Sequence, residues 1–448
     1  MRQKNVDMLS GSITKGLLAM AIPIMIMNVM QSMFNIIDMT ALEYFSDDRS
    51  VGAVGACGTL ISLCTSLLIG LSAGANVVVA KRLGAHDRDS ADKAVMTSLL
   101  ISIAGGILLG VIGVTFAETF LRMTNCPEEL LPKATIYFKI YFLGLPILMF
   151  YNFCASILRA MGDTKRPMYF LILGGAIKIA FTIFLITVFD MTVEGVAIST
   201  VISFLVIGIL AFTTLLRSND IIHIDFHKIR FDLKEFKDIL FIGIPSGLQT
   251  AMYSFANVII TTTVNSFGPD ATTGISIANQ FDGILYQMTY APSLAVIPYV
   301  AQNIGARNVK RVKQIIIKAI LITVAFGATF GSLSAVFSAQ LASIMASSEV
   351  VIKFAQQKMM LISSTYFICG INEIMGGILK GMGKPVFPAV ATLLYMCLFR
   401  FVWVYGIYPL FPQNLTFLYL VWPLGWILSI ITLLIVYFPA MRKLEKQN

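Results

Sequence analysis

The chain has 448 residues, of which 57% are hydrophobic and 13% charged, and its mean hydropathy is +0.81. Soluble globular domains carry roughly 25% charged residues, so this composition excludes an ordinary soluble protein. Apolar runs of about 20 residues, the length that crosses a bilayer, recur along the whole sequence. We therefore expect an all-α polytopic membrane protein that is embedded in the lipid bilayer.

The net charge of +9 comes from basic residues that are spread over the loops rather than gathered in one patch. Of the 33 Lys and Arg, 25 fall in one alternate set of connections and five, Lys358 among them, in the other set. Lys139, Lys178 and Arg400 lie inside apolar runs. An excess of Lys and Arg marks cytoplasmic loops. The distribution argues against nucleic acid as a partner and predicts a cell-membrane protein with both termini in the cytoplasm.

The first apolar stretch, Ala21–Leu42, contains polar residues at steps of three and four, which share one face of a helix. These residues are Asn28, Gln31, Asn35 and Asp38. An ionisable residue within an apolar span normally faces a bundle interior or a water-filled cavity, so Asp38 is the first candidate functional residue. Alternatively, Asp38 lies near the outer end of its helix and extends to the membrane interface.

Twelve spans are predicted along the chain, six in each half. They are 13–40, 52–79, 94–121, 134–158, 168–189, 193–216, 238–266, 271–300, 314–345, 352–379, 386–410 and 416–440. The longest hydrophilic interruption follows the sixth span. We therefore expect an N-terminal lobe at 1–216, a cytoplasmic linker at 217–237 and a C-terminal lobe at 238–448.

The two halves repeat each other at offsets near 221 residues. Ala21–Pro23 matches Gly243–Pro245, and Ala80–Asp87 matches Ala301–Asn308. In a third match, the Arg-Ala-Met-Gly turn that begins at Arg159 corresponds to the Lys-Gly-Met-Gly turn that begins at Lys380. Six spans per half predict a parallel repeat with a cavity between the halves, which is typical of secondary transporters.

These segments resemble the multidrug and toxic compound extrusion (MATE) transporters. The pattern Pro23…Gln31…Asp38, the turn Ala80–Asp87 and the turn Arg159–Thr164 carry the resemblance, which covers the whole chain. It implies two pseudo-symmetric six-helix lobes that alternate between inward-open and outward-open forms. It also implies a secondary antiporter that exports amphipathic, mostly cationic drugs or toxins in exchange for protons or sodium ions.

The resemblance implies that Asp38 is the aspartate used for ion coupling and drug release. In DinF-like members with a sodium site, helix 5 supplies an Asn and an Asp, and helix 6 a Thr. The matching positions here are Lys178, Thr182 and Thr200. A lysine ammonium donates hydrogen bonds only and would repel sodium where a carbonyl ligand is needed.

The NorM-like branch places acids on helices 7 and 10, where this chain has Tyr253 and Cys369. We therefore favour the DinF-like branch, with protons as the coupling ion and sodium as the alternative. We hypothesise that deprotonated Asp38 pairs with Lys178 or with a cationic drug, and that protonation releases either one. Alternatively, Lys178 faces another helix end or interfacial water.

The second half offers a parallel polar stripe. Asn279, Asp282, Tyr286 and Tyr290 share one helical face, and a buried acid beside aromatic rings suits an organic cation. Glu373 lies next to an asparagine in a later span, and Arg400 is expected to neutralise one of these acids. Helix packing is the alternative role for all of them. The predicted substrate-binding residues are Asn28, Gln31, Asn35, Asp38, Tyr253, Asn257, Asn279, Asp282, Tyr286 and Glu373.

Other functional classes find little support in the sequence. No Gly-x-x-x-x-Gly-Lys-Ser/Thr motif occurs, which argues against ATP as the energy source, and no catalytic cluster points to an enzyme. The six Cys and three His form no metal-ligand spacing, so neither a metal nor a cofactor is expected. We expect a monomer that binds small molecules. A flippase for lipid-linked saccharides is the alternative, although equal numbers of intramembrane cations and acids favour cationic or neutral cargo.

Overall fold

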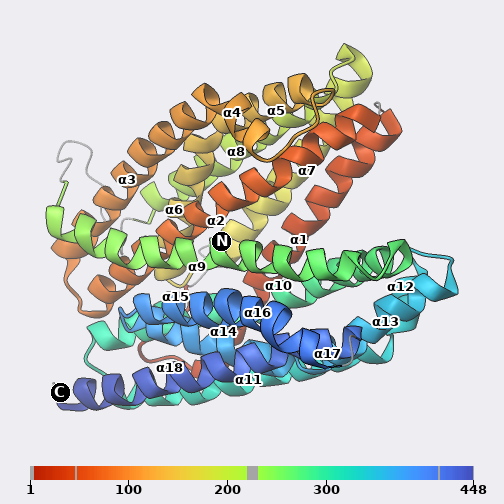
Figure 1. The fold of residues 1–448 in the computed structure, drawn as a ribbon. Helices are drawn as coiled ribbons and strands as arrows, with labels where there is room; N and C mark the ends of the chain where they lie inside the picture. The colour runs from red at the N-terminus through yellow and green to blue at the C-terminus, as the bar shows by residue number, and fades with distance from the viewer. Residues whose placement is uncertain (1–4, 46–47, 219–230, 412–413, 447–448) are drawn as a thin grey trace. The chain divides into compact units, whose positions relative to one another are not determined.

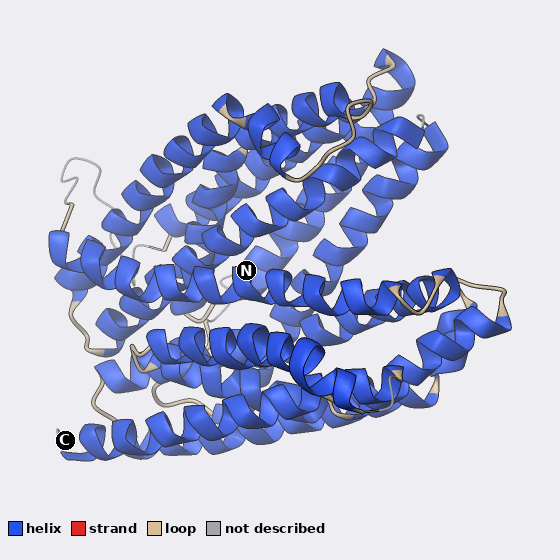
Figure 2. Ribbon diagram, in the orientation of Figure 1, coloured by secondary structure: helices blue, strands red, loops and turns tan. Residues whose placement is uncertain are grey.

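The computed structural model describes residues 5–45, 48–218, 231–411 and 414–446. Some side chains inside the described helices are left out, among them those of Asn35, Asp38 and Asn257. The described ranges consist of helices joined by loops and contain no strand (Figure 2). The predicted all-α fold is therefore confirmed.

The chain divides into two compact units. Unit 1 comprises Met1–Asn5 and Val29–Ile244, and unit 2 comprises Val6–Asn28 and Pro245–Asn448. Both divisions fall inside long helices, which are α1 (Ile13–Phe45) and α9 (Leu233–Asn265). The lobe boundaries predicted from span counts stay a prediction, and most of the predicted linker lies outside the described residues.

Unit 1 contains seven further helices, which Figure 1 traces from orange to yellow-green. They are α2 (Asp48–Gly84), α3 (Arg88–Thr115), α4 (Ala117–Met123), α5 (Leu131–Leu143), α6 (Leu145–Ala160), α7 (Lys165–Phe189) and α8 (Val193–Leu216).

Unit 2 continues from α9 to the end of the chain, from green to blue in Figure 1. Its elements are α10 (Pro269–Gly305), α11 (Val309–Val336), α12 (Ser338–Ser343), α13 (Glu349–Ser364), α14 (Tyr366–Gly381), α15 (Val386–Thr392), η2 (Leu393–Leu398), α16 (Phe399–Val402), η3 (Trp403–Ile407), η4 (Tyr408–Leu410), α17 (Leu415–Tyr419) and α18 (Val421–Lys446).

All twelve predicted spans correspond to a helix or to consecutive helices of the structure. Eight helices of the described chain are long and apolar enough to cross a membrane, and two bent pairs raise the number to ten. The remaining two predicted spans are α9 and α10, which have 33 and 37 residues. Both helices are long enough to form a span.

The repeat predicted from short motifs extends to the breaks in the helices. The α5–α6 pair bends by 44° at Gly144 and the α13–α14 pair by 50° at Thr365, 221 positions later. The same offset joins His86 to Arg307, both with φ of 55°. It also joins Gly162 to Gly383, whose positive φ angles of 84° and 74° suit glycine.

One helix differs clearly between the halves. In unit 1, α7 runs unbroken for 25 residues. Its counterpart in unit 2 is divided by two π-helical segments, η2 and η3, with the four-residue α16 between them. Short π-helical insertions rotate the side chains that follow and are frequent at functional sites. Arg400 lies in α16.

The first helix of each half begins in one unit and ends in the other. In unit 2, the amide nitrogen of Asn303 donates to the Met8 carbonyl at 3.0 Å, and Nε of Arg311 donates to the same oxygen at 3.1 Å. In unit 1, Arg82 pairs with Glu235 of α9 at 2.8 Å. Burial is the main cause that raises the pKa of Glu235, and Arg82 opposes it. These contacts fix both helix starts.

Candidate functional site

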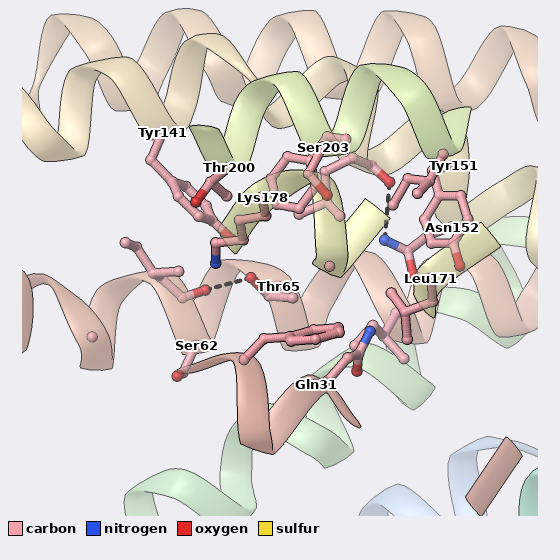
Figure 3. A pocket seen from close by; sticks show the side chains of 18 of the residues that line it. Gln31, Ser62, Thr65, Tyr141, Tyr151, Asn152, Leu171, Lys178, Thr200 and Ser203 are labelled. Carbon is pink, nitrogen blue, oxygen red and sulfur yellow. Dashed lines mark hydrogen bonds between the residues drawn. The ribbon is translucent and has the colours of Figure 1, made fainter. Parts of the chain in front are cut away.

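Unit 1 contains a cavity of about 500 Å³ bordered by α1, α2, α5, α6, α7 and α8 (Figure 3). Hydroxyl, amide and aromatic side chains supply most of its polar surface. Figure 3 shows Lys178 extending from α7 into the space, while Gln31 enters from α1. Among the described side chains that line this cavity, Lys178 is the one charged group.

Several hydroxyl groups around this cavity are held by their own helices. Thr200 donates to the Val196 carbonyl at 2.8 Å, and Thr65 donates to the Ile61 carbonyl at 2.7 Å. Their oxygen lone pairs remain able to accept hydrogen bonds from a bound molecule. In the described part of its lining, the cavity thus combines one cation with neutral hydroxyl and amide groups on an otherwise apolar wall.

Three of the residues predicted in this half line the cavity: Gln31, Lys178 and Thr200. Thr182 does not line it; it is buried, with its hydroxyl 2.6 Å from that of Ser199. Asn28 belongs to unit 2 and does not line either cavity. The side chains of Asn35 and Asp38 lie outside the described ones. The pairing of Asp38 with Lys178 therefore stays a prediction.

Unit 2 contains a second cavity of about 380 Å³, bordered by α9, α10, α13, α14, α16 and α18. Its walls are strongly aromatic. The aromatic side chains that line it are Tyr253, Tyr286, Tyr366, Trp422 and Trp426. Ligand cavities of about 300–1,000 Å³ with apolar walls and a few placed polar groups are typical of small-molecule sites.

A buried ion pair crosses this second cavity. The Lys358 ammonium lies 2.9 Å from Oδ2 of Asp282 and also donates to the side-chain oxygen of Asn279. Lys358 is only 2% exposed. The remaining oxygen of Asp282, Oδ1, is buried without a hydrogen-bond partner in the described structure. Asn279 and Asp282 were both predicted from the sequence, and the structure brings them together.

The placement of Lys358 corrects one prediction. The sequence interpretation assigned Lys358 to an outer connection, but α13 begins at Glu349, so Lys358 lies more than two turns inside a helix and faces α10. Its position inside the predicted span 352–379 was the signal that could have identified it. A lysine can be buried when an opposite charge and further acceptors satisfy its ammonium group.

A second cation lies close to this pair. The guanidinium carbon of Arg400 lies 5.1 Å from the ring centroid of Trp422, and the Lys358 nitrogen lies 5.8 Å from the same centroid. Cations within about 6 Å of an aromatic face are attracted by its quadrupole. Arg400 was expected to neutralise an acid, but Asp282 is paired with Lys358.

Glu373 lies behind the cavity wall rather than in it. The hydroxyl of Tyr253 donates to Oε1 of Glu373 at 2.6 Å, and Ser293 donates to the Glu373 carbonyl at 2.7 Å. Glu373 is 5% exposed and is not part of the lining. Among the residues that line the cavity, Tyr253 is the one with a described hydrogen bond to its carboxyl group. Asn257, another of the predicted substrate-binding residues, lies outside the described side chains.

The predicted aromatic stripe on α10 is also present. The ring of Tyr286 stacks on that of Tyr290, with centroids 5.5 Å apart, and lies 6.2 Å from that of Tyr253. Tyr253 and Tyr286 line the cavity, and Tyr290 extends the row beyond it. Stacked rings of this kind offer a flat apolar surface to a bound molecule.

The chain is similar in sequence to known proteins. The model of the MatE family matches residues 23–184 and 245–405, so it matches each half once. The probable multidrug resistance protein YoeA of Bacillus subtilis is 26% identical over 390 residues, which are 85% of this chain and 84% of that protein. A protein of Shewanella oneidensis named FAD transporter is 23% identical over 399 residues, which are 87% of each chain.

The fold also matches solved structures over its full length. A multidrug resistance MATE family transporter of the MOP superfamily, solved in an outward-facing conformation, superposes with a TM-score of 0.91. It shares 21% sequence identity, and the match covers 100% of both chains. At this identity the likeness establishes the fold alone.

Proposed function

Because the chain belongs to the MATE family, whose members are membrane transporters rather than enzymes, we propose that it exports amphipathic organic compounds in exchange for protons. The proposed cycle alternates the two halves between inward-open and outward-open forms. Protons are the proposed coupling ion, and no cofactor takes part. The names of the relatives, with multidrug resistance among them, support the choice of cargo.

The single observation that carries this proposal is the pair of cavities. Each unit holds a space of several hundred Å³ whose walls mix aromatic rings with a few polar groups. Such walls accept the apolar part of many compounds, and the polar groups orient them. A site for one defined metabolite would need more fixed hydrogen-bonding partners than these walls provide.

The proposed coupling residues are Asp38, Lys178, Thr182 and Thr200. The position of Lys178 in the cavity supports protons over sodium, because an ammonium group that lines the cavity disfavours a second cation nearby. Thr182 is buried beside Ser199 and does not line the cavity, so its hydroxyl is not offered to a sodium ion in that space. Deprotonated Asp38 attracts Lys178 or a cationic part of the cargo, and protonation of Asp38 releases it.

The charge expected for the cargo depends on how many cations and acids lie inside the spans. Three intramembrane cations against three acids favoured cationic or neutral compounds, but Lys358 is a further cation inside a predicted span, and it is buried. One relative is named for FAD, a phosphate-containing compound. We therefore propose amphipathic cargo without one fixed sign of charge for the transporter as a whole.

The test is dye efflux from proteoliposomes with an imposed proton gradient or an imposed sodium gradient. Wild type should export under the proton gradient alone, and Asp38→Asn should abolish this export. Asp270→Asn, which removes an exposed acid at the start of α10, is the matched control and should export like wild type.

Export driven by sodium alone would contradict proton coupling. Full proton-driven export by Asp38→Asn would exclude Asp38 as the coupling residue. Absence of export under either gradient would favour the flippase alternative, because a flippase for lipid-linked saccharides need not carry the dye.

A further inference from the structure

We propose that one end of unit 2 is a binding site for an anionic phospholipid of the membrane. The site lies where α11 begins and where α18 ends, near the C label in Figure 1. Its cations face the phosphate of the headgroup, and the acyl chains lie along exposed apolar faces of the two helices. This inference goes beyond the proposed export function and depends neither on the cargo nor on the coupling ion.

The first observation is a basic patch that the two helices share. The patch consists of six exposed cations and one exposed acid: Lys310, Lys313, Lys318, Arg442, Lys443, Lys446 and Glu445. The Lys313 ammonium pairs with the Glu445 carboxylate, which joins the start of α11 to the end of α18. The other five cations make no ion pair or hydrogen bond among the described residues. They are therefore available to an anion from outside the chain.

The second observation is an exposed apolar face on each helix, next to the patch. On α11, Ile317 and Leu321 are 60% and 63% exposed, and on α18, Ile435 and Phe438 are 67% and 58% exposed. In a membrane protein, such side chains face the lipid tails. Lys318 follows Ile317 directly, so its long side chain extends from the apolar level towards the headgroups, where the phosphates lie.

Helical spacing aligns the cations with these apolar side chains. Lys310, Lys313 and Ile317 follow one another at steps of three and four on α11. Phe438, Arg442 and Lys446 do so at steps of four on α18. A headgroup held by the cations therefore leaves its acyl chains on apolar residues of the same face. A soluble anion would use the cations alone, so this continuity favours a lipid.

The repeat shows that the patch is a feature of unit 2 rather than of every such helix start. The offset of 221 residues relates α3 to α11 over their whole length. At the positions of Lys310 and Lys313, α3 has Asp89 and Asp92. The excess of Lys and Arg on cytoplasmic loops would favour cations at both helix starts. Basic pockets between helices on that side of a membrane protein bind anionic headgroups, which gives the cations of unit 2 a role of their own.

The experiment measures lipid binding to the purified full-length protein in detergent at low ionic strength, by native mass spectrometry. Dioleoyl phosphatidylglycerol is the anionic probe. Dioleoyl phosphatidylcholine has the same acyl chains and no net charge. The first phosphatidylglycerol should bind at least about tenfold more tightly than the first phosphatidylcholine. Equal affinities for the two lipids would overturn the inference.

Three substitutions locate the site. Lys318→Gln and Arg442→Gln should each weaken phosphatidylglycerol about fivefold, the effect of one cation near an anionic surface, and leave phosphatidylcholine unchanged. Lys310→Asp, which gives α11 the acid of α3, changes the charge by two and should weaken it about 25-fold. All three side chains are exposed, so unfolding midpoints without lipid should stay close to wild type. A triple variant that binds phosphatidylglycerol like wild type would overturn the inference.

The matched control is Lys81→Gln. Lys81 is an exposed cation near the end of α2 in unit 1, and it lines neither cavity. Its substitution lowers the net charge by the same amount as Lys318→Gln and should leave phosphatidylglycerol binding unchanged. An equal loss in both variants would assign the effect to overall charge and overturn the proposed site.

Glycerol 3-phosphate distinguishes a lipid from a soluble phosphate, because it carries the phosphate without acyl chains. It should displace phosphatidylglycerol only at concentrations at least about a hundredfold higher, since it lacks the apolar contacts. Displacement at equal concentrations would show that the apolar faces contribute nothing and would overturn the lipid assignment. None of these measurements depends on export, so a failure of the proposed function would leave their outcome unchanged.

Discussion

The two cavities are bordered by equivalent helices of the repeat, but different side chains line them. The 221-residue offset that relates Gly144 to Thr365 also makes Tyr137 the equivalent of Lys358 in the repeat. It likewise makes Ile61 the equivalent of Asp282. The charged pair of unit 2 thus occupies positions that are aromatic and aliphatic in unit 1. Among the described side chains, the cavity of unit 1 has a single cation beside neutral polar groups, whereas that of unit 2 has a paired acid, an arginine and two tryptophans.

This difference shows which features the repeat preserves. Helix breaks and left-handed turn residues recur in both halves, because they set how helices pack and reverse. The side chains that face a cavity make few packing contacts, so they can differ without loss of the fold. Two cavities of one transporter can therefore recognise different parts of a cargo, or different cargoes.

The largest expected effect comes from breaking the ion pair of unit 2. Lys358→Met leaves the Asp282 charge buried without its cation, so we expect a loss of about 3–5 kcal/mol of stability. The double variant Lys358→Met/Asp282→Leu removes both charges and should recover most of it. The measurement is the unfolding free energy in mixed micelles. A single variant as stable as wild type would show that the pair contributes little.

A smaller effect on stability is expected from substituting two glycines, one in the lining of each cavity. A Cβ at Gly175 in α7 would lie 1.8 Å from the Phe34 ring, so Gly175→Ala should cost about 1–3 kcal/mol through overpacking. A Cβ at Gly283 in α10 meets no atom of the described residues within 4 Å, so Gly283→Ala should gain about 0.5–1 kcal/mol. Unfolding midpoints of the two variants check this order, and a reversed order would contradict the packing around Phe34.

The smallest effect concerns two equivalent helix caps. The side chain of Asp87 accepts from the Ser90 amide at the start of α3, and Asn308 accepts from the Arg311 amide at the start of α11. Hydrogen bonds from Ser90, first from its side chain and then from its backbone, lower the pKa of Asp87. Only the cap of unit 1 should therefore respond to acid.

Since the pKa of Asp87 is lowered by folding, its contribution to stability is present above the pKa of the unfolded chain and is lost as the pH falls through the folded-state pKa. Wild type should exceed Asp87→Asn in stability at neutral pH, and the two should converge in acid. Unfolding midpoints between neutral and acidic pH test this. A difference that stays constant with pH would mean that the carboxylate charge has no role.

The sequence was sufficient for the spans and the repeat, because hydropathy and short turn motifs report directly on membrane crossing and chain reversal. It did not predict the π-helical segments around Arg400, since η2 contains neither proline nor glycine and the single Gly406 in η3 does not by itself mark a π-helix. The placement of Lys358 was missed because hydropathy does not say which way a helix face turns. Asn279, Asp282 and Tyr286 were found, because their helical spacing alone groups them on one face.

The packing of the first helix has a consequence for how the chain is made. The Met8 carbonyl bonds to Asn303 and Arg311, which are 295 and 303 residues further along the sequence. At about 5–20 residues synthesised per second, the beginning of α1 waits about 15–60 s for its partners. During that interval its apolar surface needs lipid or an insertion factor to cover it. Slower synthesis between the two halves should therefore lower the yield of correctly assembled protein more than slower synthesis near the C-terminus.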